Sequence, residues 1–336
     1  MKLFNRMMHA DFAYELLNEK EYIFLYANPK TEEGLEKRGT RVKEDLCPLK
    51  YYEIEYFSIG TSRENKIEEG FCIRGDDDSI KEYASLRKKD MYLFLENIFS
   101  LSKKLVVDFT LMNARFLGAF CALLNMFQWE EVYFCYTEPG KYKKNKQDKY
   151  DLKNATMGFD QIPSLETFSD SSTECDWVIF LGFEGSRLMR LEEESPSSRR
   201  FTLPYISIPA MKTNWHNAAL DANSQFFELK INNQGSVEYV SAINPFETYE
   251  KLTHLKHTNA NVRLVVSPIG PKPVMLGCVM YVLENEDEML LFDNPLQEGN
   301  NTEDYGASHF YDLSQFVRAV KNKRFIKEED QCVEVH

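Results

Sequence analysis

Residues 263–283 read RLVVSPIGPKPVMLGCVMYVL, and this stretch decides the fold. A β-branched strand pattern over Arg263–Ser267 runs into a loop with three prolines and a glycine, and the pattern of an apolar helix follows at Pro273–Leu283. A strand, a short loop and a helix in this order are the building unit of a parallel sheet with helices on its faces. The stretch therefore predicts an α/β fold.

The same order of strands and helices runs through both halves of the chain. In the first half we expect strands at Tyr22–Ala27 and Tyr52–Ile59, a helix at Ile80–Ser102, a strand at Leu105–Thr110, a helix at Ala114–Phe127 and a strand at Glu131–Thr137. In the second half we expect strands at Trp177–Gly182 and Leu203–Ile208, a helix at Pro245–His257, a strand at Arg263–Ser267, a helix at Pro273–Leu283 and a strand at Glu288–Asp293, with an extra helical segment at Trp215–Phe227.

Matching landmarks in the two halves keep a near-constant offset of about 150–160 residues, which indicates an internal repeat. We therefore predict two tandem Rossmann-like units with mainly parallel sheets, related by internal duplication. The polar segment between the halves is the natural linker. We place the first domain at 1–145, the linker at 146–173, and the second domain at 174–336 with a C-terminal helix at Asp312–Lys323.

Composition limits the classes of function. The chain has 336 residues and a net charge of −13, so nucleic acid is not expected as a ligand of the whole surface. The first residues lack an apolar signal-peptide core, and no stretch is long and apolar enough for a membrane span. The seven cysteines form no C-x-x-C pair. We expect a cytoplasmic protein with no membrane partner, no metal ion and no bound cofactor.

Ligands of an open parallel sheet bind beyond the carboxyl ends of its strands, so the loops that follow the strands are the candidate sites. After the strand at Leu105–Thr110, Asp108, Thr110, Asn113 and Arg115 lie at the start of a helix. Its unpaired N–H groups attract anions, and Arg115 adds a positive charge. The alternative is that Asp108 and Asn113 only cap the helix.

The corresponding loop of the second half is 267–273, in which Ser267, Gly270 and Lys272 are the candidate ligand-binding residues. Gly270 permits a close backbone approach, and Pro273 suits the first turn of a helix. Lys272 brings a cation to the start of that helix on a stiff loop. The spacing is not that of a P-loop.

A third candidate loop follows the strand Trp177–Gly182. Two glycines flank an acid here, and Gly182, Glu184 and Arg187 are the candidate ligand-binding residues. The alternative is a tight turn in which Arg187 pairs with an acid at 192 or 193 on the exposed helix face.

A fourth candidate lies at the end of the strand Glu131–Thr137, where Glu138 could orient a hydroxyl group and Tyr142 could stack on a base or act as a packing lid. Pro139 and Gly140 alone would explain a turn there.

The strand, the short Gly/Pro loop with Lys272-Pro273, and the helix of small residues resemble the "GTKP" loop of CRISPR-associated Rossmann-fold sensor domains, which bind cyclic oligonucleotides. Gly270, Lys272 and Pro273 match that loop in kind, and Pro271 replaces its threonine. The tandem arrangement together with 182–187 also resembles uncharacterised bacterial proteins from antiphage or mobile loci. The resemblance implies a bacterial sensor that binds a nucleotide-like ligand and takes part in antiphage defence.

Three functions remain open. The first is a sensor or adaptor that binds a nucleotide-like or phosphorylated ligand. The second is a nucleotide hydrolase or transferase that uses the loop carboxylates Asp108, Glu184 and Glu138, although the sequence has no G-x-S-x-G or H-E-x-x-H motif. The third is an interaction subunit of a partner ATPase or nuclease, or a homo-oligomer, because the two halves no longer share loop residues.

Overall fold

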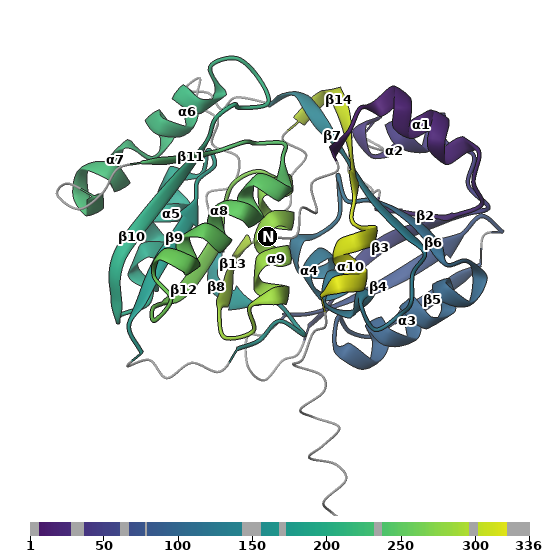
Figure 1. The fold of residues 1–336 in the computed structure, drawn as a ribbon, viewed down its shortest axis with the longest axis horizontal. Helices are drawn as coiled ribbons and strands as arrows, with labels where there is room; N and C mark the ends of the chain where they lie inside the picture. Colours follow the sequence, from purple (N-terminus) through teal and green to yellow (C-terminus); the bar gives the residue numbers. More distant parts are fainter. Residues whose placement is uncertain are drawn as a thin grey trace, which may run out of the picture. The chain divides into compact units, whose positions relative to one another are not determined.

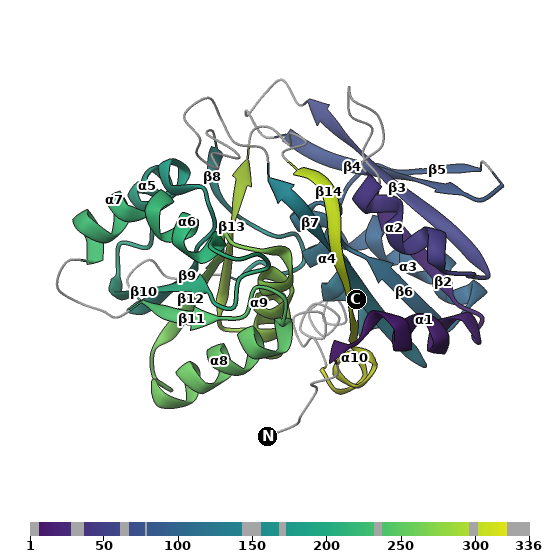
Figure 2. The ribbon, with the colours of Figure 1, turned by 90° about the horizontal axis from the view of Figure 1, so that it is seen from above.

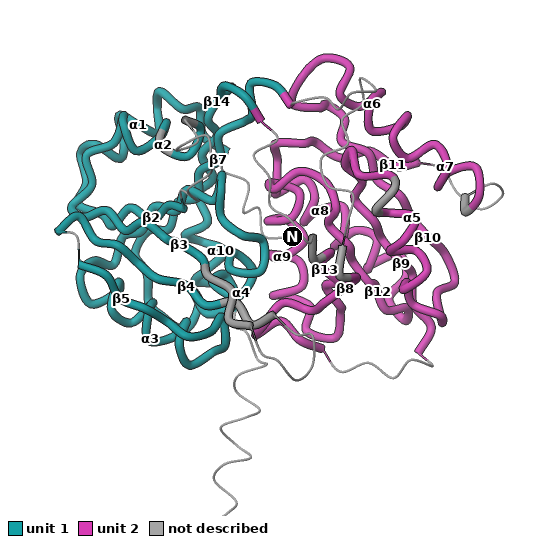
Figure 3. Tube along the Cα trace, turned by 180° about the vertical axis from the view of Figure 1, so that it is seen from behind, with its two compact units in different colours: residues 1–141, 303–322 teal, residues 142–302, 323–336 magenta. Residues whose placement is uncertain are grey.

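The computed structural model describes residues 7–27, 37–60, 67–77, 79–142, 156–167, 173–231, 237–295 and 302–320. The chain forms two compact units (Figure 3). Residues 1–141 and 303–322 make the first unit, and residues 142–302 and 323–336 make the second. The chain therefore leaves the first unit at the end of one strand and returns to it for the last strand and helix.

The first unit contains an eight-stranded sheet of order β1-β14-β7-β6-β2-β3-β4-β5 (Figure 1). Its strands are β1 (Met7–Met8), β2 (Ile23–Ala27), β3 (Lys50–Gly60), β4 (Ile67–Gly75), β5 (Ile80–Tyr83), β6 (Lys104–Asp108), β7 (Glu131–Tyr142) and β14 (Thr302–Asp312). Its helices are α1 (Ala10–Asn18), α2 (Lys37–Asp45), α3 (Lys88–Leu101), α4 (Ala114–Leu124) and α10 (Ser314–Ala319). The four central strands β7, β6, β2 and β3 are parallel, whereas β4 and β5 continue the sheet in antiparallel order.

The second unit contains a six-stranded sheet of order β11-β10-β9-β12-β13-β8. Its strands are β8 (Thr156–Gln161), β9 (Cys175–Phe180), β10 (Arg199–Ser207), β11 (Glu238–Val240), β12 (Arg263–Pro268) and β13 (Met289–Pro295). Its helices are α5 (Gly185–Glu193), α6 (Trp215–Ala222), α7 (Ser224–Phe226), a π-helical turn at Phe227–Ile231, α8 (Pro245–Thr258) and α9 (Lys272–Glu284). All its strand pairs are parallel except the edge pair of β13 and β8.

The parallel cores of the two sheets have the same strand order. In the first unit the order is β3-β2-β6-β7, and in the second it is β10-β9-β12-β13. In each core the second strand of the chain lies on one side of the first, and the third strand lies on the other side. The order of the strands therefore reverses between the first and the third, while all four strands stay parallel. The predicted α/β class with mainly parallel sheets is confirmed. The same order occurs widely in doubly wound sheets, so the internal duplication stays a prediction.

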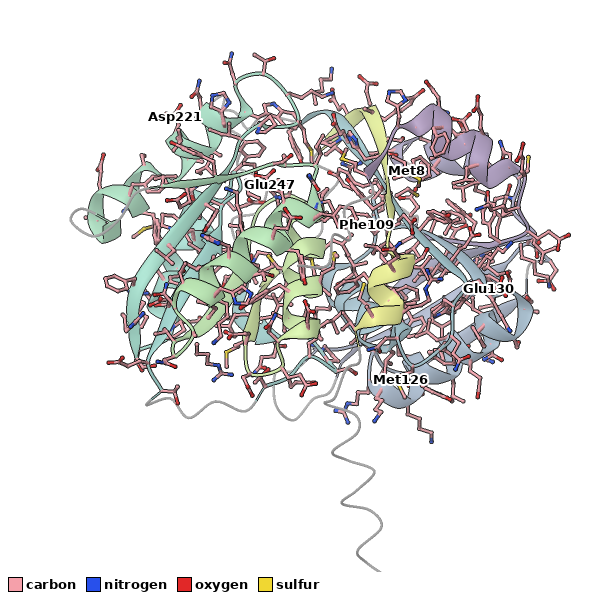
Figure 4. All side chains as sticks on the ribbon, in the orientation of Figure 1. Met8, Phe109, Met126, Glu130, Asp221 and Glu247 are labelled. Atoms are coloured by element: carbon pink, nitrogen blue, oxygen red, sulfur yellow. The ribbon has the colours of Figure 1, made fainter. Side chains whose placement is uncertain are left out.

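Aromatic rings fill the face of the first sheet that α3 and α4 cover. Phe71 of β4 contacts Phe94 of α3 and Phe116 of α4, with ring centroids 5.5 and 5.1 Å apart. Phe116 stacks on Phe120, and Phe109, labelled in Figure 4, extends the cluster beyond the end of β6. The other face packs against α1 and α2. Alternate residues of each strand therefore supply two separate cores.

Helices also cover both faces of the second sheet (Figure 2). The face toward α5, α6 and α7 holds a core built around Trp177, Ile179 and Leu188. On the other face α8 packs against α9, and α9 contacts β12 and β13. Because α9 is buried along 273–283, its sequence is apolar on every side.

Two segments differ from the sequence interpretation because they pair with distant strands. The last strand, β14, lies beside β7 in the first sheet, whereas we expected this segment in the second domain. Its exposed stretch Glu303–Tyr305 reads as a loop, and its pairing with β7 is not visible locally. Likewise, the expected linker 146–173 contains β8, which pairs with β13 at the edge of the second sheet.

The remaining corrections concern local structure. The helix predicted at Ile80–Ser102 begins only at Lys88, because Ile80–Tyr83 forms the edge strand β5. Strand β7 continues through Pro139 and Gly140 to Tyr142, without the turn that these two residues suggested. The described part of the last helix is shorter than predicted and ends at Ala319.

Two observations concern the predictions about membrane spans and cysteines. Among the described helices, none combines the length and the apolar character that crossing a bilayer requires. The six described cysteines are free thiols, and Cys332 lies outside the described residues. Burial raises the pKa of the Cys121, Cys135 and Cys278 thiols, which behave as small apolar side chains.

The contact between α8 and α9 depends on Gly277. A Cβ atom at this position would lie 2.3 Å from the carbonyl oxygen of Pro245 and 2.6 Å from Cβ of Thr248. The first of these atoms is backbone at the start of α8, so it cannot rotate away. The two helices can therefore approach this closely only if residue 277 has no side chain.

We expect Gly277→Ala to lower the free energy of unfolding by about 2–3 kcal/mol, because the helices must separate. The higher helix propensity of alanine offsets only about 1 kcal/mol of this loss. Urea denaturation followed by tryptophan fluorescence measures the change. His254→Ala, at an exposed position of α8, is the control and should leave stability unchanged. Equal stability of both variants would contradict the close contact.

Candidate functional site

A pocket opens in the second unit at the carboxyl ends of β9, β10 and β12. Its empty space is about 520 Å³, its open mouth included. It is lined by Tyr142, Leu181, Gly182, Phe183, Glu184, Ser207, Ala210, Met211, Trp215, His216, Ala219, Ala242, Ile269, Gly270 and Pro271. The strand order reverses between β9 and β12, and this is where open α/β sheets bind their ligands.

The floor of the pocket is a direct backbone contact between the loops that follow β9 and β12. A Cβ atom at Gly182 would lie 2.9 Å from the carbonyl oxygen of Ile269. A Cβ atom at Gly270 would lie 3.1 Å from the carbonyl oxygen of Leu181. A side chain at either glycine would push the loops apart. The two glycines therefore fix the distance between the two walls of the pocket.

Helices α5 and α6 hold the loop after β9 from the other side. The buried amide of Asn223 donates hydrogen bonds to the carbonyl oxygens of Gly182, at 2.8 Å, and Ala219, at 2.7 Å. A Cβ atom at Gly185 would overlap the carbonyl oxygen of Ala222, because α5 begins directly against the end of α6. The backbone around Gly182 is thus held on both sides.

Three aromatic rings form one wall of the pocket. The ring of Tyr142 lies 5.4 Å from that of Phe183 and 4.9 Å from that of Trp215, and Phe183 and Trp215 are 5.8 Å apart, all between ring centroids. At these distances the rings touch one another in edge-to-face and tilted contacts. We call these three residues the aromatic cluster. It offers a ligand an apolar wall with no gap between the rings.

The charge of the pocket is set by one carboxylate. Among the lining residues Glu184 is the one carboxylate and His216 the one imidazole, and none is lysine or arginine. An oxygen of the Glu184 carboxylate lies over Gly182, where a Cβ atom would be 2.6 Å from it. A carboxylate and an imidazole in one pocket can accept hydrogen bonds from a ligand and can also move a proton.

The pocket brings together three of the residues predicted for the second unit, namely Gly182, Glu184 and Gly270. Ser267 has a different role, because it is buried and its hydroxyl accepts a 2.8 Å hydrogen bond from the indole of Trp177. It therefore supports the core under the pocket.

Of the two predicted cations of the second unit, Lys272 is not among the residues that line the pocket. Lys272 is the first residue of α9 and follows Pro271, which does line the pocket. Arg187 lies on α5, and its side chain is outside the described residues.

In the first unit the side chains of the predicted residues accept hydrogen bonds from backbone N–H groups of their own turn and of β7. The Asp108 carboxylate accepts from the backbone N–H of Thr110 at 2.9 Å, and the Thr110 hydroxyl accepts from the N–H of Thr137 at 2.8 Å. Asn113 caps α4 by accepting from the N–H of Arg115 at 2.7 Å. Asp108 and Thr110 are 1% and 0% exposed. Asn113 is therefore the helix cap that the sequence left as the alternative, whereas Asp108 closes a turn before the helix.

Glu138 also has a partner within its own sheet. Its carboxylate lies 2.7 Å from Nε2 of His309, across the β7–β14 pair, and both side chains are almost buried. On the neighbouring residue, the hydroxyl of Thr137 is 2.9 Å from that of Ser308. Of the three predicted acids, Glu184 is the one that lines the described pocket.

The sequence interpretation missed most of the pocket's aromatic and titratable side chains. Trp215 and His216 begin α6, which we predicted as a helix without a role. Phe183 stands between Gly182 and Glu184 in a loop that we did select. The signal in the sequence that could have identified Phe183 is an apolar ring beside glycines at the end of a strand. Tyr142 was named, but with packing as the favoured role.

The described residues contain no group of three or more His, Cys, Asp or Glu side chains that could hold a metal ion. The chain matches no family model, no curated protein and no solved structure. The chemistry of the pocket therefore carries the argument about function.

We expect Asn223→Ala to destabilise the protein by about 2 kcal/mol, because the carbonyl oxygens of Gly182 and Ala219 each lose a hydrogen bond from the buried amide. Chemical denaturation measures the change. Asn217→Ala removes the same side chain from an exposed position of α6 and should have an effect below about 0.5 kcal/mol. If the two variants were equally stable, the Asn223 amide would not support the pocket.

Proposed function

We propose that this protein is a sensor or adaptor that binds a nucleotide-like ligand, with the base of the ligand in the pocket of the second unit. The observation that carries the proposal is the aromatic cluster at the point where the strand order reverses. Ligand pockets combine apolar and aromatic walls with a few polar groups that orient the ligand. Glu184 and His216 supply those polar groups here.

The charge of the pocket determines which part of the ligand can lie inside it. The Glu184 carboxylate repels a phosphate, so the pocket itself suits the uncharged base and not the phosphate. A phosphate of the same ligand then belongs near the mouth. Lys272 stands one residue beyond the lining residue Pro271, at the N-terminal end of the thirteen-residue helix α9. A lysine and a helix N-terminus are both favourable for an anion.

The role of sensor follows from the resemblance to cyclic-oligonucleotide sensors at Gly270, Lys272 and Pro273. In this proposal the ligand is a signal, and its presence changes the contacts of the protein with a partner. The antiphage setting that the resemblance implies is part of the same proposal. Binding requires only the walls of the pocket, and these are the part of the site that the geometry supports best.

We expect a nucleoside or nucleotide to raise the melting temperature of the protein, by the equivalent of about 2.7 kcal/mol at a ligand concentration of one hundred times Kd. A thermal-shift panel of the common nucleosides and their nucleotides measures this effect. Phe183→Leu is expected to weaken binding about tenfold, because an aromatic face worth about 1–3 kcal/mol is lost.

Phe201→Leu is the matched control for the ring. Phe201 is 45% exposed, lies on β10 and is not a lining residue of the pocket. This variant should keep the ligand response of the wild type. A protein that no nucleoside or nucleotide stabilises, or a Phe183→Leu variant that responds as the wild type does, would contradict the proposal.

Lys272→Ala is expected to weaken the binding of a nucleotide about tenfold and to leave the binding of the matching nucleoside unchanged, because a charged hydrogen bond contributes about 1.5–3 kcal/mol. Isothermal titration calorimetry with each pair of ligands separates the two effects. Lys251→Ala, on α8, is the control for loss of a surface charge. Equal loss for the nucleoside would show that Lys272 does not contact the phosphate.

A further inference from the structure

Two side chains at the wall of the pocket carry polar groups that the protein leaves unpaired. Among the described residues, neither the hydroxyl of Ser207 nor the imidazole of His216 makes a hydrogen bond or an ion pair, although both are half-buried and line the pocket. Glu184, which lines the same pocket, already interacts with another group of the protein. Ser207 and His216 are therefore the side chains whose hydrogen bonds a ligand can complete.

Other serines of the second unit show what a structural role looks like. The hydroxyl of Ser198 donates a 2.7 Å hydrogen bond to the carbonyl oxygen of Thr173, and the hydroxyl of Ser267 accepts a 2.8 Å hydrogen bond from the indole of Trp177. The hydroxyl of Ser207 has neither kind of partner in the part of the chain that the structure describes. Support of the local backbone or of the core thus does not account for it.

The two unpaired groups lie on one side of the pocket. Ser207 is the last residue of β10, and His216 is the second residue of α6, a helix that contacts β10. Gly270 and Pro271 line the opposite side, because β12 lies across β9 from β10 in the sheet. Lys272 follows them in the chain. The lysine and the two unpaired groups therefore belong to opposite sides of the pocket.

This arrangement determines which part of a nucleotide faces Ser207 and His216. In the proposed function the base covers the aromatic cluster and the phosphate lies near Lys272. The sugar joins the base to the phosphate, so the edge of the base that points away from the sugar faces β10 and α6. On that edge each common base carries a ring nitrogen beside an amino or an oxo group, and proteins that bind single bases read these groups by hydrogen bonds.

The donor and acceptor roles of the two side chains are interchangeable. A serine hydroxyl both donates and accepts, and its hydrogen rotates to suit the partner. A neutral imidazole has one N–H and one acceptor nitrogen, and either nitrogen can carry the proton. An amino edge presents a donor beside an acceptor, and an oxo edge presents an acceptor beside a donor. The same two side chains match both edges.

We infer, on the basis of the proposed function, that Ser207 and His216 bind the edge of the base and accept its amino and oxo forms alike. The ligand class is then a nucleoside or nucleotide with an amino or oxo group at position 6 of a purine or position 4 of a pyrimidine. A base without that group leaves one of the two side chains unpaired. Sites that hydrogen-bond a particular group of a ligand discriminate against analogues that lack it.

Isothermal titration of the full-length protein with two sets of nucleosides tests the inference. The first set is adenosine, inosine and purine riboside, and the second is cytidine, uridine and pyrimidin-2-one riboside. In each set the compounds carry, in this order, an amino group, an oxo group and a hydrogen at the position in question. Within a set that binds, we expect the amino and oxo compounds to differ less than about tenfold, and the third compound to bind at least about tenfold more weakly than both.

Ser207→Ala and His216→Leu should each weaken the amino and the oxo compound about tenfold, because one hydrogen bond to the edge is lost. His216→Gln keeps a donor and an acceptor in one side chain and should restore both affinities to within about threefold of the wild type. His254→Leu, at an exposed position of α8, is the matched control and should bind as the wild type does. Without ligand, all variants are expected to melt at the wild-type temperature, which circular dichroism measures.

Three results would overturn the inference and leave the proposed function in place. The first is a preference of about tenfold or more between the amino and oxo compounds. The second is a third compound that binds within about tenfold of the other two, and the third is wild-type affinity in both Ser207→Ala and His216→Leu. If none of the six compounds binds but another nucleoside raises the melting temperature, the inference also fails alone. If no nucleoside or nucleotide does so, the proposed function fails with it.

Discussion

The backbone contact between the loops that follow β9 and β12 is the constraint on which the pocket depends. Gly182 and Gly270 meet there without side chains, each close to a carbonyl oxygen of the other loop. The two strands are parallel neighbours in register from Arg263↔Cys175 to Pro268↔Phe180, so both loops start at the same level of the sheet. The paired strands place the two loops side by side, and the glycines allow their backbones to touch. This contact forms the bottom of the pocket and fixes the distance between its walls.

A carboxylate above such a floor must be stabilised while the site is empty. Glu184 is only partly buried, and water at the open mouth of the pocket can solvate it. In the proposed function, a flat base that covers the aromatic cluster displaces part of that water. A hydrogen-bond donor on the base would then offset the lost hydration of Glu184.

The sequence predicted the parts of the fold that local pattern controls. The strands β2, β6, β9 and β12 and the helices α4, α8 and α9 follow from apolar runs and their period. Strands β8 and β14 did not, because both contain many polar residues and each is defined by its pairing with a strand far away in the chain. The site divides in the same way. Gly182, Glu184 and Gly270 lie on the predicted loops, whereas Tyr142 and Trp215 reach the pocket from segments far away in the chain.

The two units have the same order of parallel strands but differ in the polar side chains at the strand ends. At the ends of β6 and β7, the buried side chains of Asp108 and Thr110 accept hydrogen bonds from the backbone N–H groups of Thr110 and Thr137. A ligand that used those groups would first have to break bonds that stabilise the unit. At the ends of β9 and β12 the carbonyl oxygen of Gly182 accepts a hydrogen bond from Asn223, and Glu184 is one of the residues that line the pocket. The first unit therefore buries Asp108 and Thr110 at its strand ends, whereas the second unit has Glu184 at the wall of a pocket.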